Sequence, residues 1–224
     1  MSNANCSLRI LCIHGYRQNS TSFQKKTGAL RKQLKKQVEL VYIDAPHKVP
    51  TSDESQLQEK PADVNGDQRG WWFSDYQNCS FDARQECESS LGLEQSLEAV
   101  RMAVKNLGPF DGILGFSQGA ALAAMLCSLQ EQKLEPTFNF RFAILVAGFR
   151  SACAQHQYLY KGVNVMVPSL HVYGKDDKVI PEQMSQDLLP LFQGAHVLNH
   201  QGGHFVPAAS AHKHIYQEFL TSFQ

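Results

Sequence analysis

The residues most able to do chemistry in this chain surround Ser117, at the centre of the pentapeptide Gly115-Phe116-Ser117-Gln118-Gly119. An apolar run precedes this G-x-S-x-G pattern and an alanine-rich segment follows it, which predicts a strand, a sharp turn and a helix. A serine at such a turn takes a strained backbone conformation, and the flanking glycines let strand and helix pass closely. The pattern predicts a nucleophile elbow that displays the Ser117 hydroxyl.

A general base for this serine is expected near the C-terminus, in His200-Gln201-Gly202-Gly203-His204. The paired glycines let the loop bend back toward the elbow, which favours His204. His200 directly follows the last predicted strand and is expected to point to solvent or into the loop. The H-x-x-x-H spacing also suggests zinc, but helical presentation is not expected across two glycines and no glutamate follows the first histidine. We therefore expect a proton-transfer role for His204 and no metal.

A carboxylate that could orient the imidazole follows the fifth predicted strand, where Asp176 and Asp177 lie in a turn. Either aspartate could hold the productive tautomer and stabilise the imidazolium. The G-x-x-D-x-x-x-P spacing resembles the acid turn of acyl-thioesterase-like hydrolases, which favours Asp177 and leaves Asp176 to cap the turn. The alternative is a plain Asx turn. The chain order Ser, Asp, His is the order used by α/β-hydrolases.

Donors for a developing oxyanion are expected from the backbone. One is the N–H of Gln118, directly after the nucleophile, and the other is the N–H of Tyr16 in the loop that follows the first predicted strand. Since both are main-chain groups, side-chain truncation cannot remove them.

Periodicity is absent from residues 47–90, and so long an insertion is usually a lid, a binding loop or a disordered segment. The insertion holds both tryptophans of the chain. Its aromatic side chains could fix the loop to the core, wall an apolar acyl pocket beside Ser117, or do both. The candidate substrate-binding residues are Trp71, Trp72, Phe73, Phe149 and Phe205.

The elements that must position these residues alternate between strands and helices. The apolar runs predict strands at residues 8–13, 39–43, 112–116, 142–147, 169–173 and 196–198, and helices at 20–34, 93–107, 120–131, 184–192 and 215–223. This pattern predicts an α/β fold with a mainly parallel central sheet of about six strands and helices on both faces, with the site at the carboxyl ends of the strands. Residues 1–224 are expected to form one domain.

The composition narrows the possible partners and location. The formal net charge is zero and no long basic face exists, so nucleic acid is not a favoured partner. No leader sequence and no run of about 20 apolar residues is found, so we expect a soluble, intracellular protein of the cytoplasm, with the nucleus as a second location. The six cysteines lack metal-ligand spacing and are expected to be free thiols.

Taken together, these motifs resemble the fungal-type family of serine hydrolases nearly end to end. The blocks that carry the resemblance are CIHGYRQ at 12–18, KTGALRK at 26–32, RGWWFS at 69–74, GPFDG at 108–112, GFSQGAAL at 115–122, DKVIP at 177–181 and GGHF at 202–205. The RGWWF and GFSQGAAL blocks are far more specific than G-x-S-x-G alone. The sequence departs from the family pattern at Lys175, where a second acid would follow Gly174.

The resemblance implies an α/β-hydrolase that cleaves carboxylic esters through a triad of Ser117, Asp177 and His204, with a preference for longer acyl or alkyl chains. We expect no cofactor and a small-molecule ester as substrate. The alternatives are a thioesterase acting on acyl-protein or acyl-CoA, a peptidase, and a non-catalytic module that binds a lipid or a partner. The intact Ser, Asp, His order argues against the non-catalytic module.

Overall fold

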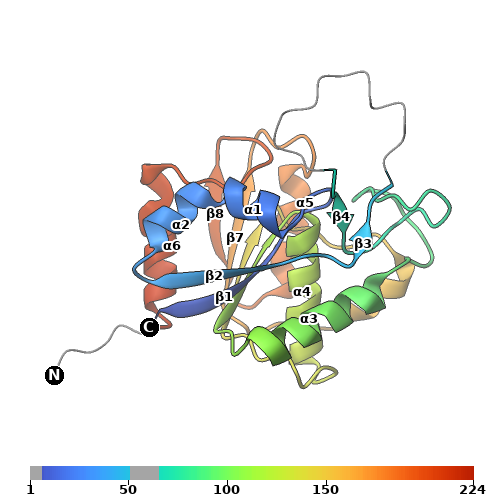
Figure 1. Ribbon diagram of the computed structural model, residues 1–224, viewed down its shortest axis with the longest axis horizontal. Helices are drawn as coiled ribbons and strands as arrows, with labels where there is room; N and C mark the ends of the chain where they lie inside the picture. Colours follow the sequence, from blue (N-terminus) through green and yellow to red (C-terminus); the bar gives the residue numbers. More distant parts are fainter. Residues whose placement is uncertain (1–6, 51–65) are drawn as a thin grey trace.

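The computed structural model describes residues 7–50 and 66–224. Its centre is a six-stranded sheet in the order β2-β1-β5-β6-β7-β8, in which every neighbouring pair is parallel. Figure 1 shows the sheet between its helices. The strands are β1 (Leu8–Ile13), β2 (Val38–Ile43), β5 (Gly112–Phe116), β6 (Phe142–Val146), β7 (Ser169–Gly174) and β8 (His196–His200). The predicted parallel α/β sheet is confirmed.

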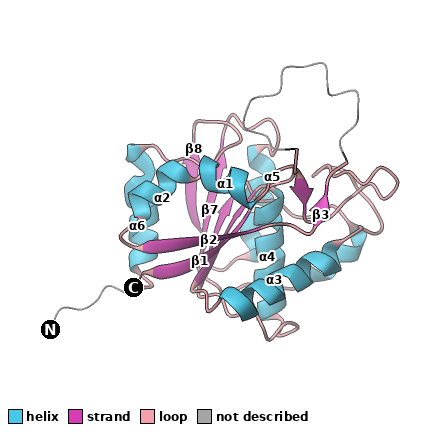
Figure 2. Ribbon diagram, in the orientation of Figure 1, coloured by secondary structure: helices cyan, strands magenta, loops and turns pink. Residues whose placement is uncertain are grey.

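Helices flank the sheet on both sides, with α1, α2 and α6 on one side and α3 and α4 on the other (Figures 1 and 2). The helices are α1 (Ser20–Lys26), α2 (Gly28–Leu34), α3 (Leu93–Leu107), α4 (Gln118–Glu131), α5 (Glu182–Leu188) and α6 (Ser210–Thr221), with 3-10 helices η2 (Ala154–Leu159) and η3 (Leu189–Leu191). Among the residues described, none of these helices combines the length and the apolar character needed to span a membrane.

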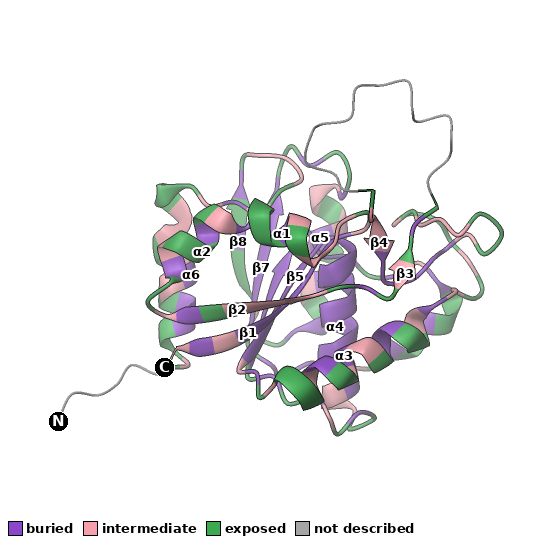
Figure 3. Cartoon of the chain, in the orientation of Figure 1, coloured by how far each residue is buried: buried purple, intermediate pink, exposed green. Residues whose placement is uncertain are grey.

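The deepest part of the core lies where α4 crosses the sheet. Strands β5, β6 and β7 are buried along their whole length, and α4 is buried from Gln118 to Leu129 (Figure 3). The small alanine side chains of α4 let its backbone approach the strands closely, and burial on all sides explains why its sequence has no polar stripe. The helix that follows Ser117 is therefore held rigidly.

Two predicted helices differ in detail from the observed ones. The helix expected at 20–34 is split at Thr27, whose hydroxyl donates to the Phe23 carbonyl and whose backbone leaves helical geometry. The helix expected at 184–192 ends at Leu188 and continues as η3, in which Pro190 lacks the N–H that an α-helix needs.

The insertion at 47–90 contains local structure that its sequence pattern did not predict. Strands β3 (His47–Lys48) and β4 (Arg69–Gly70) form a small antiparallel sheet. Single backbone bridges join Gln18 to Arg69 and Cys87 to Cys153. The described part of the insertion is thus attached both to the loop after β1 and to the segment after β6.

Candidate active site

Ser117 adopts the strained conformation that the elbow requires, with φ 55° and ψ −118° between β5 and α4. A non-glycine residue in such a region costs about 1–3 kcal/mol and is typical of functional sites. A side chain at Gly115 would place its Cβ 2.4 Å from the Gly119 carbonyl oxygen, and one at Gly119 would place it 2.2 Å from that of Ile13. Both glycines are therefore required by close packing, and the predicted elbow is present.

The predicted acid and base contact each other. His204 Nδ1 lies 2.7 Å from Asp177 Oδ2. The other carboxylate oxygen, Oδ1, accepts the backbone N–H groups of Val179 at 2.9 Å and Ile180 at 2.8 Å. The Asp177 side chain is 1% exposed and that of His204 is 20% exposed. Since an ionised carboxylate only accepts, this network assigns the proton to Nδ1 and leaves Nε2 of neutral His204 as an acceptor.

The turn around Asp177 is capped differently from the sequence expectation. We expected Asp176 to cap it, but Asp177 itself accepts the two turn N–H groups, and Asp176 is exposed. The Asp177 carboxylate thus caps the turn with Oδ1 and contacts the His204 imidazole with Oδ2.

The histidine loop reaches the elbow by packing closely on the acid turn. The N–H of Asp176 donates to the Gly202 carbonyl at 3.1 Å, and a Cβ at Gly174 would lie 2.1 Å from that same oxygen. The His204 ring then packs on Phe116, with ring centroids 4.7 Å apart. Because Phe116 directly precedes Ser117, the imidazole lies beside the elbow. The histidine loop thus contacts both the acid turn and the residue that precedes Ser117.

His200, the competing histidine, lies inside the loop. Its Nδ1 accepts the Gly202 N–H at 3.1 Å, and the side chain is buried. Within residues 7–50 and 66–224, no group of three or more His, Cys, Asp or Glu side chains is arranged to hold a metal ion.

The two expected oxyanion donors lie at the same end of the sheet. Gln118 is the first residue of α4, and the first N–H groups of a helix have no acceptor within the helix. No acceptor for the Tyr16 N–H is found among the described residues. The positive end of the α4 dipole also favours negative charge there.

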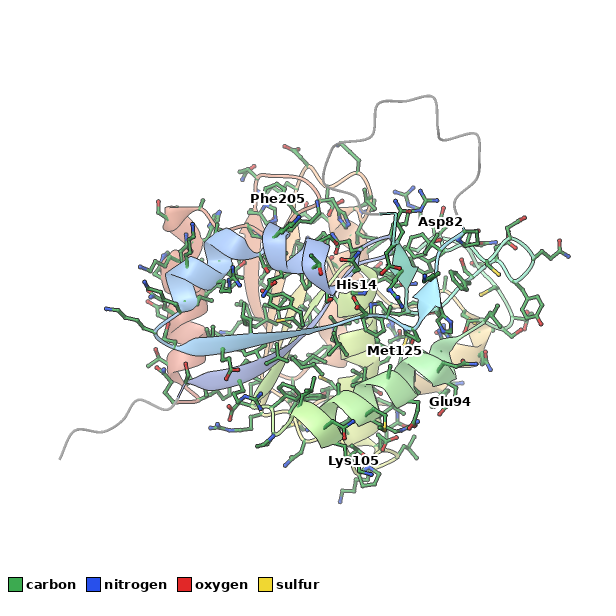
Figure 4. All side chains as sticks on the ribbon, viewed as in Figure 1. His14, Asp82, Glu94, Lys105, Met125 and Phe205 are labelled. Carbon is green, nitrogen blue, oxygen red and sulfur yellow. The ribbon has the colours of Figure 1, made fainter. Side chains whose placement is uncertain are left out.

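His14, to which sequence reasoning assigned no partner, joins the start of the Tyr16 loop to the segment after β2; Figure 4 labels this residue. Its Nδ1 donates to the Gly15 carbonyl at 2.7 Å and its Nε2 accepts the Ala45 N–H at 3.0 Å. Burial lowers the pKa of His14 to about 4, so the ring is neutral at physiological pH. A neutral ring is what this pattern needs, because Nε2 must accept.

The Gln118 side chain is a second contact that the sequence did not reveal. Its Oε1 accepts the Trp71 N–H and its Nε2 donates to the Trp72 carbonyl, both at 2.8 Å. The Trp71 indole in turn donates to the His14 carbonyl at 2.8 Å. The residue after the nucleophile therefore anchors the aromatic segment of the insertion to the site.

The candidate substrate-binding aromatics lie in different environments. Trp71 is buried in the core and bonded to Gln118 and His14, as expected of an aromatic residue that fixes the loop to the core. Phe73 is buried too, but its ring packs on His47 of the same insertion. Trp72 and Phe149 are also buried but line a narrow crevice. Phe205 is 49% exposed and lies near the upper edge of the molecule in Figure 4.

This crevice, which we call the aromatic crevice, runs between the insertion and the segment that follows β6. The ring of Phe81 lies among three other aromatic rings. Its centroid is 5.4 Å from the ring centroid of Tyr16, 5.3 Å from that of Trp72 and 6.0 Å from that of Phe149. In this structure it is too narrow for a water molecule. Its residues are Trp72, Ser74, Phe81, Asp82, Ala83, Gln85, Cys87, Phe149, Ser151, Ala152 and Cys153.

Buried His156 joins the two walls of the aromatic crevice. Its Nε2 and Nδ1 lie 2.7 Å from the hydroxyls of Ser90 and Ser151, respectively, and its ring meets Trp72 edge-on. Burial lowers its pKa to about 4, so it joins the walls as a neutral group.

Comparison with known proteins identifies the family and the fold. A model of the family described as Serine hydrolase (FSH1) matches residues 1–216. The chain is 68% identical to a protein of Danio rerio named Esterase OVCA2, over 97% of this chain and 98% of that protein. It is 45% identical to the Homo sapiens protein of the same name, over 96% of each.

Solved structures share the fold at lower sequence identity. The crystal structure of esterase PE8 aligns with a TM-score of 0.63 at 19% identity, covering 100% of this chain and 95% of that one. Zea mays acyl-protein thioesterase 2 aligns with a TM-score of 0.55 at 20% identity, covering 98% and 96%. The chain therefore belongs to the serine hydrolase (FSH1) family and is an esterase of the α/β-hydrolase type.

Proposed function

We propose that this enzyme hydrolyses long-chain carboxylic esters, with Ser117 as nucleophile, His204 as general base and acid, and Asp177 as the orienting carboxylate. The observation that carries the proposal is the 2.7 Å contact between His204 Nδ1 and Asp177 Oδ2, made by an imidazole that packs on the residue preceding the strained serine. An imidazole oriented by a carboxylate is the group that would take the proton of a neighbouring serine hydroxyl.

Acylation begins when Ser117 Oγ attacks the ester carbonyl carbon and its proton passes to Nε2 of His204. The N–H groups of Tyr16 and Gln118 stabilise the oxyanion of the tetrahedral intermediate, and a donor of this kind is typically worth about 3 kcal/mol. As the intermediate collapses, His204 gives the proton to the departing alcohol. Water then attacks the acyl-enzyme with His204 again as base, which releases the acid and regenerates Ser117.

Asp177 stabilises the imidazolium formed at each proton transfer without taking the proton itself. Two backbone N–H groups at Oδ1 hold the carboxylate in place, so it needs no reorganisation during the reaction. The buried position strengthens its interaction with the charged ring.

The preference for long chains is supported by the apolar surroundings of the site. The aromatic crevice contacts Tyr16 through Phe81, and Phe205 offers a half-exposed aromatic ring next to His204. An acyl or alkyl chain entering the crevice would bury apolar surface at about 25 cal/mol per Å². Because the crevice is closed in this structure, its walls would have to separate to admit a chain.

A thioester is the second candidate substrate, since the fold is shared with an acyl-protein thioesterase and the same attack on an acyl carbon applies. Thioesters would use the same serine, base and oxyanion donors. Matched oxygen and thiol esters of one acid separate the two candidates by their relative kcat/KM.

Labelling by a fluorophosphonate tests the activated serine. The unmodified enzyme should be labelled, the Ser117→Ala variant should not, and the exposed-site control Ser222→Ala should match the unmodified enzyme. Nitrophenyl esters of butyrate, octanoate and palmitate then test chain length. Labelling of the Ser117→Ala variant would show that Ser117 is not the nucleophile. An unlabelled parent enzyme would indicate a non-catalytic binding module. Equal kcat/KM for all three esters would contradict the long-chain preference.

A further inference from the structure

Cys87 and Cys153 lie opposite each other on the two walls of the aromatic crevice. They are paired in a parallel backbone bridge, and Cys153 Sγ lies 3.5 Å from the Glu88 carbonyl oxygen, next to Cys87. Neighbouring strands lie about 4.8 Å apart, within the separation of about 4.4–6.8 Å between Cα atoms that a disulfide accepts.

The backbone holds this pair in register. Ala154 N–H donates to the Cys87 carbonyl at 2.8 Å, and Gln155 N–H donates to the Glu88 carbonyl at 2.9 Å. His156, three residues after Cys153, fastens the same two segments through Ser90 and Ser151. The backbone therefore holds Cys87 and Cys153 opposite each other, which distinguishes this pair from an accidental encounter of mobile thiols.

We propose that Cys87 and Cys153 form a reversible oxidation site, in which hydrogen peroxide converts the two thiols into a disulfide that joins the walls of the aromatic crevice.

The reaction balances with peroxide as the only oxidant. The thiolate of Cys87, the more exposed of the two residues, attacks one peroxide oxygen; the O–O bond breaks and a sulfenic acid and water form. The sulfur of Cys153, which is 2% exposed, then attacks the sulfenic sulfur, forms the S–S bond and releases a second water. Two thiols and one peroxide thus give one disulfide and two waters, and an external dithiol reverses the step.

The local environment makes this oxidation slow at neutral pH. Burial, together with the hydrogen bond and charge of the Cys153 thiol, raises the pKa of Cys87 to about 11. Because the thiolate is the reactive form, the rate of disulfide formation should rise about tenfold per pH unit between pH 7 and 9. The site would respond to sustained peroxide and not to brief exposure.

The effect of the disulfide on catalysis rests on the proposed function, in which an acyl chain must part the two walls of the crevice. A covalent link between Cys87 and Cys153 would oppose that opening. Neither cysteine is hydrogen-bonded to Ser117, Asp177 or His204, so we expect the chemical step itself to remain. The oxidised enzyme should therefore lose turnover of palmitate esters while keeping turnover of butyrate esters.

Disulfide formation is tested first by mass spectrometry, independently of any activity. The enzyme is treated with peroxide at pH 8.5, free thiols are alkylated, and the digest is searched for a Cys87–Cys153 cross-linked peptide lighter by two hydrogen atoms. The unmodified enzyme and the matched control Cys79→Ser should both give it, and dithiothreitol should remove it. Cys87→Ser and Cys153→Ser should not. The proposed site would be wrong if Cys87 and Cys153 were both found alkylated after peroxide treatment, or if the main cross-link joined other cysteines.

Activity is measured next on the same samples. We expect kcat/KM for the palmitate ester to fall about tenfold on oxidation and to recover with dithiothreitol, while the value for the butyrate ester changes by less than about twofold. The Cys87→Ser variant, compared with itself before treatment, should show no such loss. If the cross-link forms but kcat/KM for the palmitate ester is unchanged, the disulfide does not control access to the aromatic crevice, and that part of the proposal is wrong. Equal loss of kcat/KM on both esters would also contradict it, because it would show that the disulfide disturbs Ser117, Asp177 or His204. If the enzyme were inactive on every ester, the proposed function would be wrong, but the cross-link result would still stand.

Discussion

The side-chain oxygen of Gln118 accepts the backbone N–H of Trp71 at 2.8 Å, across 47 residues of sequence. The same side chain donates to the Trp72 carbonyl, so one buried amide satisfies two buried backbone groups of the insertion. The position after the nucleophile thus has two tasks, since its backbone faces the proposed oxyanion and its side chain fixes the aromatic segment. This contact couples the insertion to the elbow.

Replacing Gln118 by leucine should destabilise the protein and impair catalysis together. The change leaves the Trp71 N–H and the Trp72 carbonyl buried without partners, at about 1–3 kcal/mol each. We expect the free energy of unfolding, from urea titration, to fall by about 2–6 kcal/mol. The control Gln24→Ala, on the exposed side of α1, should change it by less than about 0.5 kcal/mol. A stability loss at Gln118 no larger than at Gln24 would contradict this account.

The paired aspartates allow the orienting acid to be tested against its neighbour. Asp177→Asn keeps the size of the side chain but can present an amide N–H to His204, which favours the wrong tautomer; losses of about 10⁴-fold in kcat are typical of this change. Asp176→Asn alters an exposed residue and should leave kcat within about twofold. Steady-state kinetics on one ester measure both. Comparable kcat values for the two variants would remove Asp177 from the proposed triad.

Much of this arrangement could be predicted from the sequence because it depends on local patterns. The apolar runs located all six strands of the central sheet, and the G-x-S-x-G turn located the elbow, because strand burial and the need for glycine are set by neighbouring residues. Ser117, Asp177 and His204 each follow a predicted strand of the parallel sheet, namely β5, β7 and β8, and a parallel sheet brings the residues after its strands to one edge.

The contacts that could not be predicted join residues distant in sequence through buried backbone groups. His14 bonds the Ala45 N–H, Gln118 bonds Trp71 and Trp72, and no residue type near Ala45 marks it as a partner. The expectation for Asp176 failed for a related reason. The sequence shows two adjacent aspartates, but only the packed turn determines which one has both its oxygens directed inward.

Acid should weaken the fold through three buried histidines whose pKa values are lowered by burial to about 4, namely His14, His156 and His171. An unfolded histidine titrates near 6.5, so below that pH the unfolded chain binds protons that the folded chain does not. Stability is thus fully present above about pH 6.5 and is lost as the pH falls toward 4, by on the order of 1–2 kcal/mol per histidine at pH 5.

Urea titrations at several pH values measure this loss. The slope of unfolding free energy against pH between 6.5 and 5 should be smaller in the His171→Gln variant than in the unmodified enzyme, whatever its absolute stability, because one buried titrating group is removed. Parallel slopes in the two proteins would show that His171 contributes nothing to the acid sensitivity.

Gly174 offers the sharpest test of how the histidine loop is held. A Cβ there would lie 2.1 Å from the Gly202 carbonyl oxygen and 2.7 Å from His200 Cε1, and the first of these neighbours is backbone that must shift. Since Gly202 precedes His204 by two residues, Gly174→Ala should push the imidazole away from the elbow. A displacement of about 1 Å can cost about 10²-fold in rate, so we expect kcat to fall by that order. The control Gly28→Ala, where a Cβ would meet nothing within 4 Å, should keep full activity. If Gly174→Ala kept the kcat of this control, the position of His204 would not depend on the packing of its loop against the acid turn.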